Sequence, residues 1–221
     1  MRLEAERLAC RRGGRMVFHD LSFCVAAGQA ALLRGPNGVG KSSLLRVLAG
    51  LIPPASGEIR LDKTATADDA SARQEQVAYA GHQDAVKPAL GVRQNLAAWA
   101  GIFDTPTQRI DDALAFFGLD QISGRPAAQC SAGQKRRLGL ARLMVVDRPV
   151  WLLDEPTVSL DAGSAGLVAD LVKRHCAAGG SAIIATHIDM DLPGAALIEM
   201  TPPTANAPTL DGDAFLAGDW A

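Results

Sequence analysis

The chain has 221 residues, a net charge of −2 and 48% apolar residues, so it can build one α/β domain or one core with an inserted subdomain. The near-neutral charge excludes bulk electrostatic attraction to nucleic acid or to an anionic membrane as the main mode of partner binding. The longest apolar candidate, 138–153, contains three charged residues and falls short of the roughly 18 uninterrupted residues that a bilayer-spanning helix needs.

The first half of the chain is rich in strand patterns. Strands are predicted over residues 3–10, 16–25, 30–33, 57–62 and 77–80. The first two are joined by Gly13-Gly14, a typical hairpin turn. A helix is predicted from Lys41 to Ala49, where Gly50 stops it, and residues 63–76 are predicted to be loop with some helix.

The second half begins with a helical segment. Apolar residues recur every three to four positions, which predicts helices over 92–99, 108–117 and 131–146. Strands over 150–153 and 181–185 then flank a helix over 163–177, and this order indicates a mostly parallel α/β core.

The order of these elements predicts one domain over residues 1–221. Within it we expect a core formed by 1–86 and 148–200, a helical subdomain over 87–147, and a loose tail over 201–221 that is dispensable for the chemistry.

The most informative motif is Gly-Pro-Asn-Gly-Val-Gly-Lys-Ser, which matches the phosphate-binding loop pattern G-x-x-x-x-G-K-[ST] at every defined position. Glycines let successive N–H groups turn inward toward an anion, and the following helix adds its N-terminus. A Gly-rich turn that holds nothing is the alternative, but the Lys-Ser ending and the strand–loop–helix setting favour a nucleoside triphosphate. The predicted nucleotide-binding residues here are Gly35, Pro36, Asn37, Gly38, Val39, Gly40, Lys41, Ser42 and Ser43.

Lys41 supplies a positive charge to the β- and γ-phosphates, and the Ser42 hydroxyl is a predicted Mg²⁺ ligand.

A second motif follows the strand over 150–153, where Asp154 and Glu155 stand together. The carboxyl ends of parallel strands share one edge of the sheet, so these acids are expected beside the phosphate loop. Asp154 is a predicted Mg²⁺ ligand, and Glu155 is a candidate base for the attacking water. A solvated acidic turn is the alternative for this pair taken alone.

The third motif, Cys130-Ser131-Ala132-Gly133-Gln134, resembles the L-S-G-G-Q signature of ATP-binding-cassette (ABC) ATPases. Cys130 replaces Leu and Ala132 replaces the first Gly, while Ser131, Gly133 and Gln134 match. The resemblance implies that the signature of one subunit contacts the γ-phosphate held by the loop of a second subunit. A monomer is therefore expected to be nearly inactive, and ATP is expected to bring two copies together.

Further elements of the ABC pattern follow in order. Gln83 matches the glutamine that senses Mg²⁺ or water, residues 159–161 match the loop at the dimer seam, and His187 matches the histidine that contacts the γ-phosphate. The family usually stacks an aromatic residue on adenine. In this sequence Arg11 or Arg12 stands at that position, and we assign the base contact to Arg12 because a guanidinium also stacks on a base.

The resemblance covers residues 1 to about 200 and implies an α/β fold. Its expected parts are a P-loop NTPase (RecA-like) core with a mostly parallel sheet, an N-terminal antiparallel β subdomain and an inserted α-helical subdomain. The implied cofactors are ATP and Mg²⁺.

Within the ABC ATPases, the segments 79–83, 90–96 and 130–143 resemble the haem exporter ATP-binding subunits of bacterial cytochrome c maturation. This resemblance implies integral membrane permease subunits as partners, a place on the cytoplasmic face of the inner membrane, and no direct haem or nucleic-acid binding by this chain. Two alternatives are the ATPase of an unrelated importer or exporter, and a soluble ABC ATPase without a transport role.

Overall fold

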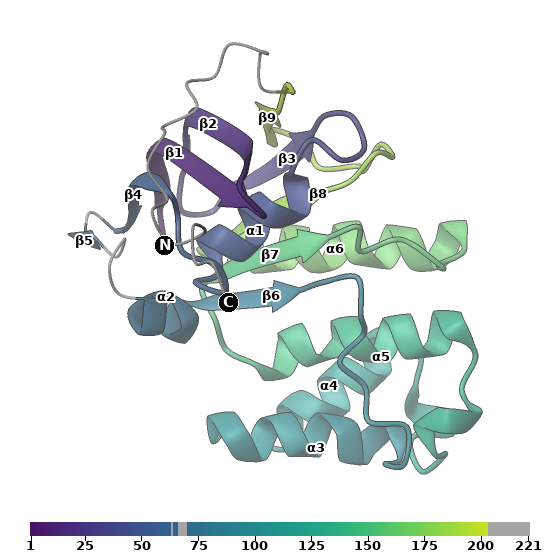
Figure 1. The fold of residues 1–221 in the computed structure, drawn as a ribbon. Helices are drawn as coiled ribbons and strands as arrows, with labels where there is room; N and C mark the ends of the chain where they lie inside the picture. The colour runs from purple at the N-terminus through teal and green to yellow at the C-terminus, as the bar shows by residue number, and fades with distance from the viewer. Residues whose placement is uncertain (63, 66–69, 203–221) are drawn as a thin grey trace, which may run out of the picture.

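The computed structural model describes residues 1–62, 64–65 and 70–202, which form two sheets and their surrounding helices (Figure 1). The strands are β1 (Leu3–Arg12), β2 (Arg15–Val25), β3 (Ala30–Arg34), β4 (Ser56–Leu61), β5 (Thr64–Ala65), β6 (Val77–Ala80), β7 (Val150–Asp154), β8 (Ser181–Ala185) and β9 (Ala196–Glu199). The helices are α1 (Lys41–Leu48), α2 (Ala70–Gln76), α3 (Val92–Phe103), α4 (Gln108–Phe116), α5 (Ala132–Val145) and α6 (Ala162–Ala177).

The smaller sheet is antiparallel, in the order β2-β1-β4-β5. Its β1–β2 hairpin turns at the predicted glycines, Gly13 and Gly14, whose φ angles of 54° and 74° lie in the left-handed region that glycine adopts without a steric penalty. Strand β1 ends two residues later than predicted, because Arg12 still pairs with Arg15 across the hairpin.

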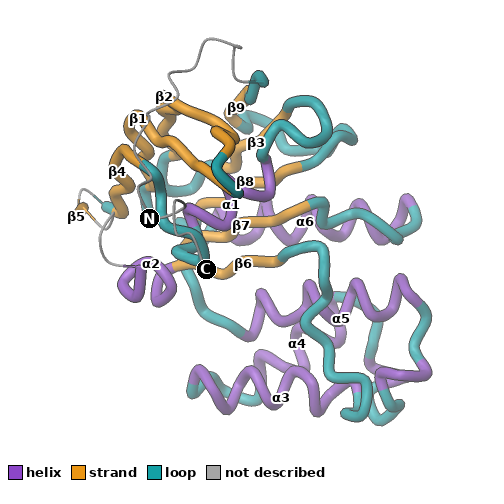
Figure 2. Tube along the Cα trace, in the orientation of Figure 1, coloured by secondary structure: helices purple, strands orange, loops and turns teal. Residues whose placement is uncertain are grey.

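The larger sheet is parallel, in the order β6-β7-β8-β3-β9. Helices α3, α4 and α5 are inserted between β6 and β7 and lie together below the sheets in Figure 2. The predicted fold class, a mostly parallel P-loop core with an antiparallel β part and an inserted helical part, is therefore confirmed.

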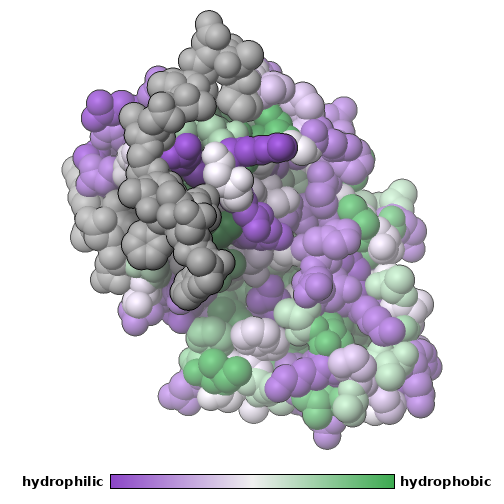
Figure 3. Space-filling model, viewed as in Figure 1, coloured by the Kyte–Doolittle hydropathy of each residue, from purple (hydrophilic) through white to green (hydrophobic). Residues whose placement is uncertain are grey.

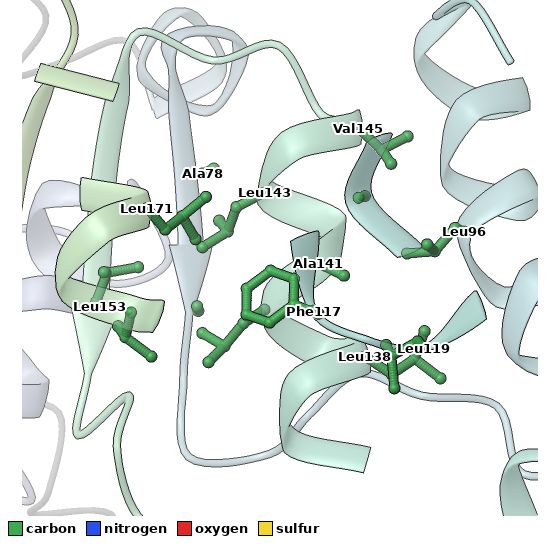
Figure 4. Close-up of a cluster of buried hydrophobic side chains, with 14 of the residues drawn as sticks. Ala78, Leu96, Phe117, Leu119, Leu138, Ala141, Leu143, Val145, Leu153 and Leu171 are labelled. Atoms are coloured by element: carbon green, nitrogen blue, oxygen red, sulfur yellow. The ribbon is translucent and has the colours of Figure 1, made fainter. Parts of the chain in front are cut away.

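The side chains of the central strands alternate between two hydrophobic cores. On β7, Val150 and Leu152 pack with α1 and the antiparallel sheet, while Trp151 and Leu153 pack with α6 and the helical insertion. Strands buried on both faces read as continuous apolar runs, which explains the sequence Val-Trp-Leu-Leu. Figure 4 shows the second core, in which Phe117 lies among side chains from α5, β7 and α6.

The space-filling view shows apolar and polar residues interspersed over the helical insertion at the bottom of the molecule (Figure 3). Ile102 on α3 is its most exposed large apolar side chain, at 69% of its full area. No helix within the described ranges is long and apolar enough to cross a membrane.

Residues 70–76 form the short helix α2, within the segment predicted to be loop with some helix, whereas the short strand β5 and strand β9 at the edge of the parallel sheet were not predicted. β9 has only four residues and two of them are exposed, so its own pattern carries little signal, and its pairing with β3 defines it. The predicted tail lies almost entirely outside the described residues, which end at 202.

His175 on α6 is held in its neutral form by packing. Its ring stacks on Trp151 with centroids 3.7 Å apart and an interplanar angle of 8°. Its Nε2 lies 3.2 Å from the carbonyl oxygens of Pro149 and Ser181, so this nitrogen carries the proton. Burial lowers the pKa of His175 below its ordinary value, more than the two carbonyl contacts raise it.

We therefore expect the free energy of unfolding to fall as the pH drops below about 6.5, because the unfolded chain then protonates His175 while the folded chain resists it. This loss levels off once the pH is below the folded-state pKa. Urea unfolding at pH 7.5 and 5.5 measures it. His175→Phe keeps the stacked ring and should shrink the difference between the two midpoints, whereas the exposed control His19→Gln should not. An equal pH dependence in His175→Phe and the parent would contradict the assignment.

Candidate active site

The predicted phosphate loop connects β3 to α1, and close packing requires two of its three glycines. Gly35 and Gly40 have φ angles of 148° and 109°, in the region that disfavours side chains. A Cβ on Gly35 would lie 2.4 Å from the carbonyl oxygen of Met200, and one on Gly40 would lie 2.5 Å from Cγ1 of Val17. The loop is therefore held against the end of β9 and against β2, in a shape that only glycine allows.

Lys41 closes the loop from within. Its side chain is buried, and Nζ donates hydrogen bonds to the carbonyl oxygens of Gly35 at 2.7 Å and Pro36 at 3.1 Å. Gly40, the N-cap of α1, has no side chain to accept from the first-turn N–H groups. The positive end of α1 and the ammonium group thus meet at the loop, which is the electrostatic arrangement that binds phosphate.

Asp154 lies at the end of β7 and faces the start of α1. The hydroxyl of Ser42 donates to Oδ1 of Asp154 at 3.0 Å, and the hydroxyl of Tyr79 donates to Oδ2 at 3.3 Å. Burial, and secondarily the charge of Asp154, raise the pKa of Tyr79, while Arg46 opposes the shift. Tyr79 therefore stays protonated and serves as a donor to the buried carboxylate.

Glu155 has a φ of 48°, unusual for a residue with a long side chain. Its N–H donates to the carbonyl oxygen of Ala185 at 2.8 Å, which fixes the turn to the end of β8. Its Oε2 lies 3.0 Å from Nδ1 of His187, although the alignment is too poor for a hydrogen bond and no other described side chain or backbone group bonds this oxygen. A strained turn that presents a carboxylate without a hydrogen-bond donor is typical of functional sites.

These groups surround one cleft of 490 Å³. Its lining residues are Arg12, Asn37, Gly38, Gly40, Lys41, Ser42, Ser43, Arg46, Asp154 and Glu155. Pro36 and Val39 line an adjoining cleft of 340 Å³, together with Met16 and Val17 of β2. A somewhat larger cleft of 530 Å³ over the antiparallel sheet contains none of the predicted site residues.

Eight predicted site residues do not line the 490 Å³ cleft: Gly35, Pro36, Val39, Gln83, Ser131, Gly133, Gln134 and His187. Gln83 lies in the exposed loop after β6. Ser131 caps α5, since its hydroxyl accepts from the N–H of Gln134 at 3.2 Å and the Gln134 side chain accepts from the N–H of Ser131 at 2.9 Å. A Cβ on Gly133 would lie 3.2 Å from the carbonyl oxygen of Ser159, so the signature segment lies beside the predicted seam loop.

The sequence did not identify Arg46 and Tyr79 as members of the site. A sequence signal existed for Arg46, because it follows Ser42 by four positions and α1 brings such pairs onto one face. Tyr79 had no such signal. Its hydroxyl reaches Asp154 only because β6 pairs with β7 in parallel, with Tyr79 opposite Leu152.

The loop geometry predicts a specific loss of affinity when the ammonium group is removed. Lys41→Met keeps the length of the side chain, and we expect it to weaken ATP binding about 10- to 100-fold, since a charge-assisted hydrogen bond contributes about 1.5–3 kcal/mol. Titration with a fluorescent ATP analogue measures this. Lys173→Met is the matched control. Lys173 pairs with Asp170 on α6 and with Asp191 in the loop between β8 and β9. Equal affinities of Lys41→Met and the parent would contradict the site.

Comparison with known proteins agrees with this geometry. The ABC transporter family model matches residues 18–158. The chain is 50% identical over 210 residues to the cytochrome c biogenesis ATP-binding export protein CcmA of Rhodobacter capsulatus, covering 95% of this chain and 92% of the relative. It is 52% identical over 200 residues to CcmA of Paracoccus denitrificans, covering 90% and 89%.

Among solved structures, the chain resembles CbiO1 from Clostridium perfringens, which is part of an ABC transporter complex. The TM-score is 0.73 and the identity is 27%, and the match covers 86% of this chain and 80% of CbiO1. The match to most of the chain and the extent of identity lead to one conclusion. The chain belongs to the ABC transporter family of ATP-binding, ATP-hydrolysing subunits, among the cytochrome c biogenesis ATP-binding export proteins.

Proposed function

We propose that this chain is the ATP-hydrolysing subunit of a membrane complex that handles haem during cytochrome c biogenesis. The observation that carries the ATPase assignment is the meeting of the phosphate loop with Asp154 and Glu155 in one cleft. The identity of about half of the residues to cytochrome c biogenesis export proteins supports the biological setting.

The triphosphate binds along the loop from Gly35 to Ser43, with its negative charge compensated by Lys41 and by the N-terminus of α1. Arg12 and Arg46, which line the same cleft, add positive charge at its rim. Arg12 is the proposed contact to the adenine base. The transfer of a phosphoryl group requires mainly positioning and charge neutralisation, and this set of groups supplies both.

The residues present fit a magnesium ion. Ser42 and Asp154 bring a hydroxyl and a carboxylate oxygen within 3.0 Å of each other, and Mg²⁺ prefers such oxygen ligands with phosphates completing the shell. Ser42 and Asp154 would hold the ion, directly or through water, with Gln83 as a further contact from the loop after β6. Bound there, Mg²⁺ would neutralise charge that develops on the phosphates.

Glu155 is the proposed general base. Glu155 lines the cleft, and none of the described residues donates a hydrogen bond to its Oε2, so the carboxylate can accept a proton from an attacking water in the cleft. His187, whose Nδ1 lies 3.0 Å from this carboxylate, is the proposed contact to the γ-phosphate. Arg34 supports His187 by donating to the carbonyl oxygens of its two neighbours, Thr186 at 3.0 Å and Ile188 at 2.7 Å.

A second copy of the chain completes the site. Ser131, Gly133 and Gln134 do not line the cleft of their own chain, yet they form a capped helix start next to the seam loop. We assign them to the γ-phosphate bound by a partner copy, where backbone N–H groups of the helix start stabilise the anion.

The dimer is proposed to act on integral membrane permease subunits of a haem exporter, from the cytoplasmic face of the bacterial inner membrane. In this arrangement haem contacts the membrane subunits and not this chain, and no nucleic acid takes part. ATP binding and hydrolysis would close and reopen the ATPase dimer and so change the conformation of its membrane partners.

Replacing Glu155 with Gln tests the chemistry. The amide keeps the shape of the side chain but cannot accept the proton, so we expect ATP turnover to fall at least about 100-fold while ATP binding persists. With ATP present, the variant should elute as a dimer in size-exclusion chromatography because the closed state is not consumed. Glu75→Gln on α2 is the control and should match the parent. Turnover near the parent rate in Glu155→Gln would refute the role of the base.

A test in cells addresses the biological setting. In source cells whose only copy carries Glu155→Gln, we expect loss of every holo-cytochrome c, with other membrane cytochromes at normal levels. Haem staining of membrane proteins and difference spectra measure the two classes. Normal c-type cytochromes would reject the haem-handling assignment and leave the ATPase chemistry standing.

A further inference from the structure

Arg136 on α5 is a buried charged residue to which the mechanism above gives no role. It is only 4% exposed. Its guanidinium makes five hydrogen bonds, and every acceptor lies outside α5. Burying an arginine is costly unless its donors are satisfied, and here all three guanidinium nitrogens have partners. The hydrogen bonds of Arg136 therefore hold other segments of the chain against α5.

Three of the acceptors are consecutive backbone carbonyls of the turn that carries the catalytic carboxylate. Arg136 donates to Asp154 O at 3.3 Å, to Glu155 O at 2.7 Å and to Pro156 O at 3.0 Å. The turn has the left-handed φ of 48° at Glu155, a conformation that persists only where surrounding contacts stabilise it. On its other side, the N–H of Glu155 is bonded to Ala185. The direction of the Glu155 side chain therefore depends on the position of Arg136.

The remaining bonds reach the loop that carries Gln83. Nη1 of Arg136 donates to the carbonyl oxygen of Gly81 and to Oδ1 of Asp84, both at 3.0 Å. The loop also packs tightly on α5, because a Cβ on Gly139 would lie 2.6 Å from the carbonyl oxygen of Asp84. One side chain thus ties the Gln83 loop and the Glu155 turn to the same helix.

That helix begins with the signature residues. Ser131 is its N-cap and Gln134 completes the capping box, so the signature and Arg136 share the first turns of one continuous helix. A shift of the helix start, as a partner copy binds there, would move Arg136 with it. The carbonyls that Arg136 holds would then move as well.

We propose that Arg136 is a positioning residue for ATP hydrolysis, which aligns Glu155 and the Gln83 loop with the signature helix and so makes the base respond to the partner subunit. This inference rests on the proposed ATPase function. A purely structural role for Arg136 is the competing explanation, and the two differ in which kinetic constant changes.

The experiment measures ATP turnover by the full chain. The protein concentration is high enough that the rate per chain no longer increases with it, so that every chain has a partner copy. Arg136→Met should lower kcat about tenfold or more, with KM for ATP within about twofold of the parent, because the phosphate loop is untouched. Arg136→Lys keeps the charge but loses the planar fork, so its kcat should lie between those of the parent and of Arg136→Met. Arg109→Met is the control. Arg109 lies on α4 of the same helical insertion, where it donates to Oδ2 of Asp147 at 2.9 Å, and it does not line the cleft, so the kcat of this variant should stay within about twofold of the parent.

A double-mutant cycle separates positioning from general damage. If Arg136 acts through Glu155, adding Arg136→Met to Glu155→Gln should reduce the residual single-turnover rate by less than about twofold. The same tenfold loss in both backgrounds, an unchanged kcat, or a loss confined to KM would overturn the inference. Urea unfolding verifies that each variant is folded, and Asp84→Ala, which removes one acceptor of Arg136, replaces Arg136→Met if that variant fails to fold.

The parent and Lys41→Met separate failure of this inference from failure of the proposed function. A parent that turns over ATP no faster than Lys41→Met would reject the ATPase assignment itself. A parent that turns over ATP normally, beside an Arg136→Met of equal kcat and KM, would reject only the role of Arg136.

Discussion

The site depends on the parallel register of β3, β8 and β7. Leu33, the penultimate residue of β3, and Asp154 at the end of β7 both pair with Ala185 of β8, so the three strands end within one residue of each other. The loops that follow therefore leave the sheet side by side, and the Ser42 hydroxyl reaches Asp154 across 112 positions of sequence. A register shift by one residue would turn Asp154 to the opposite face and break this contact, which is why buried sheet packing specifies the chemistry.

Backbone conformations with positive φ recur where the site is built, and those of Gly35, Gly40 and Glu155 are held by surrounding contacts. The phosphate loop is pressed against Met200 and Val17, which leaves no space for a Cβ on Gly35 or on Gly40. Glu155 adopts a left-handed conformation that is held from both sides, by Ala185 and by Arg136. The rigid environment compensates for the strain, so the base is presented in a defined direction before any substrate binds.

Two arginines hold the backbone segments that carry His187 and Glu155. Arg34 at the end of β3 holds the backbone on both sides of His187, and Arg136 holds the turn of Glu155 from the signature helix. A guanidinium suits this role because it offers five N–H donors in a fixed planar fork, whereas a lysine offers three donors from a single nitrogen. The inserted helices are thereby joined to the catalytic turn by hydrogen bonds as well as by the apolar core around Phe117.

The sequence by itself determined the fold class and most of the residues that line the cleft. Local rules are sufficient there: the phosphate loop is one contiguous motif, Asp154 and Glu155 end an apolar strand, and Ser131 caps its helix through Gln134. These features act over a few residues, so a pattern in the chain records them.

Only the tertiary structure decided which distant groups support that site. β9 exists because β3 offers it a partner, Tyr79 reaches Asp154 through strand pairing, and Arg136 finds its acceptors in two separate loops. An isolated arginine in a helix has no sequence feature that distinguishes a solvated side chain from one bonded to five acceptors. The difference arises from long-range packing, which brings together segments whose separation in sequence carries no periodic signal.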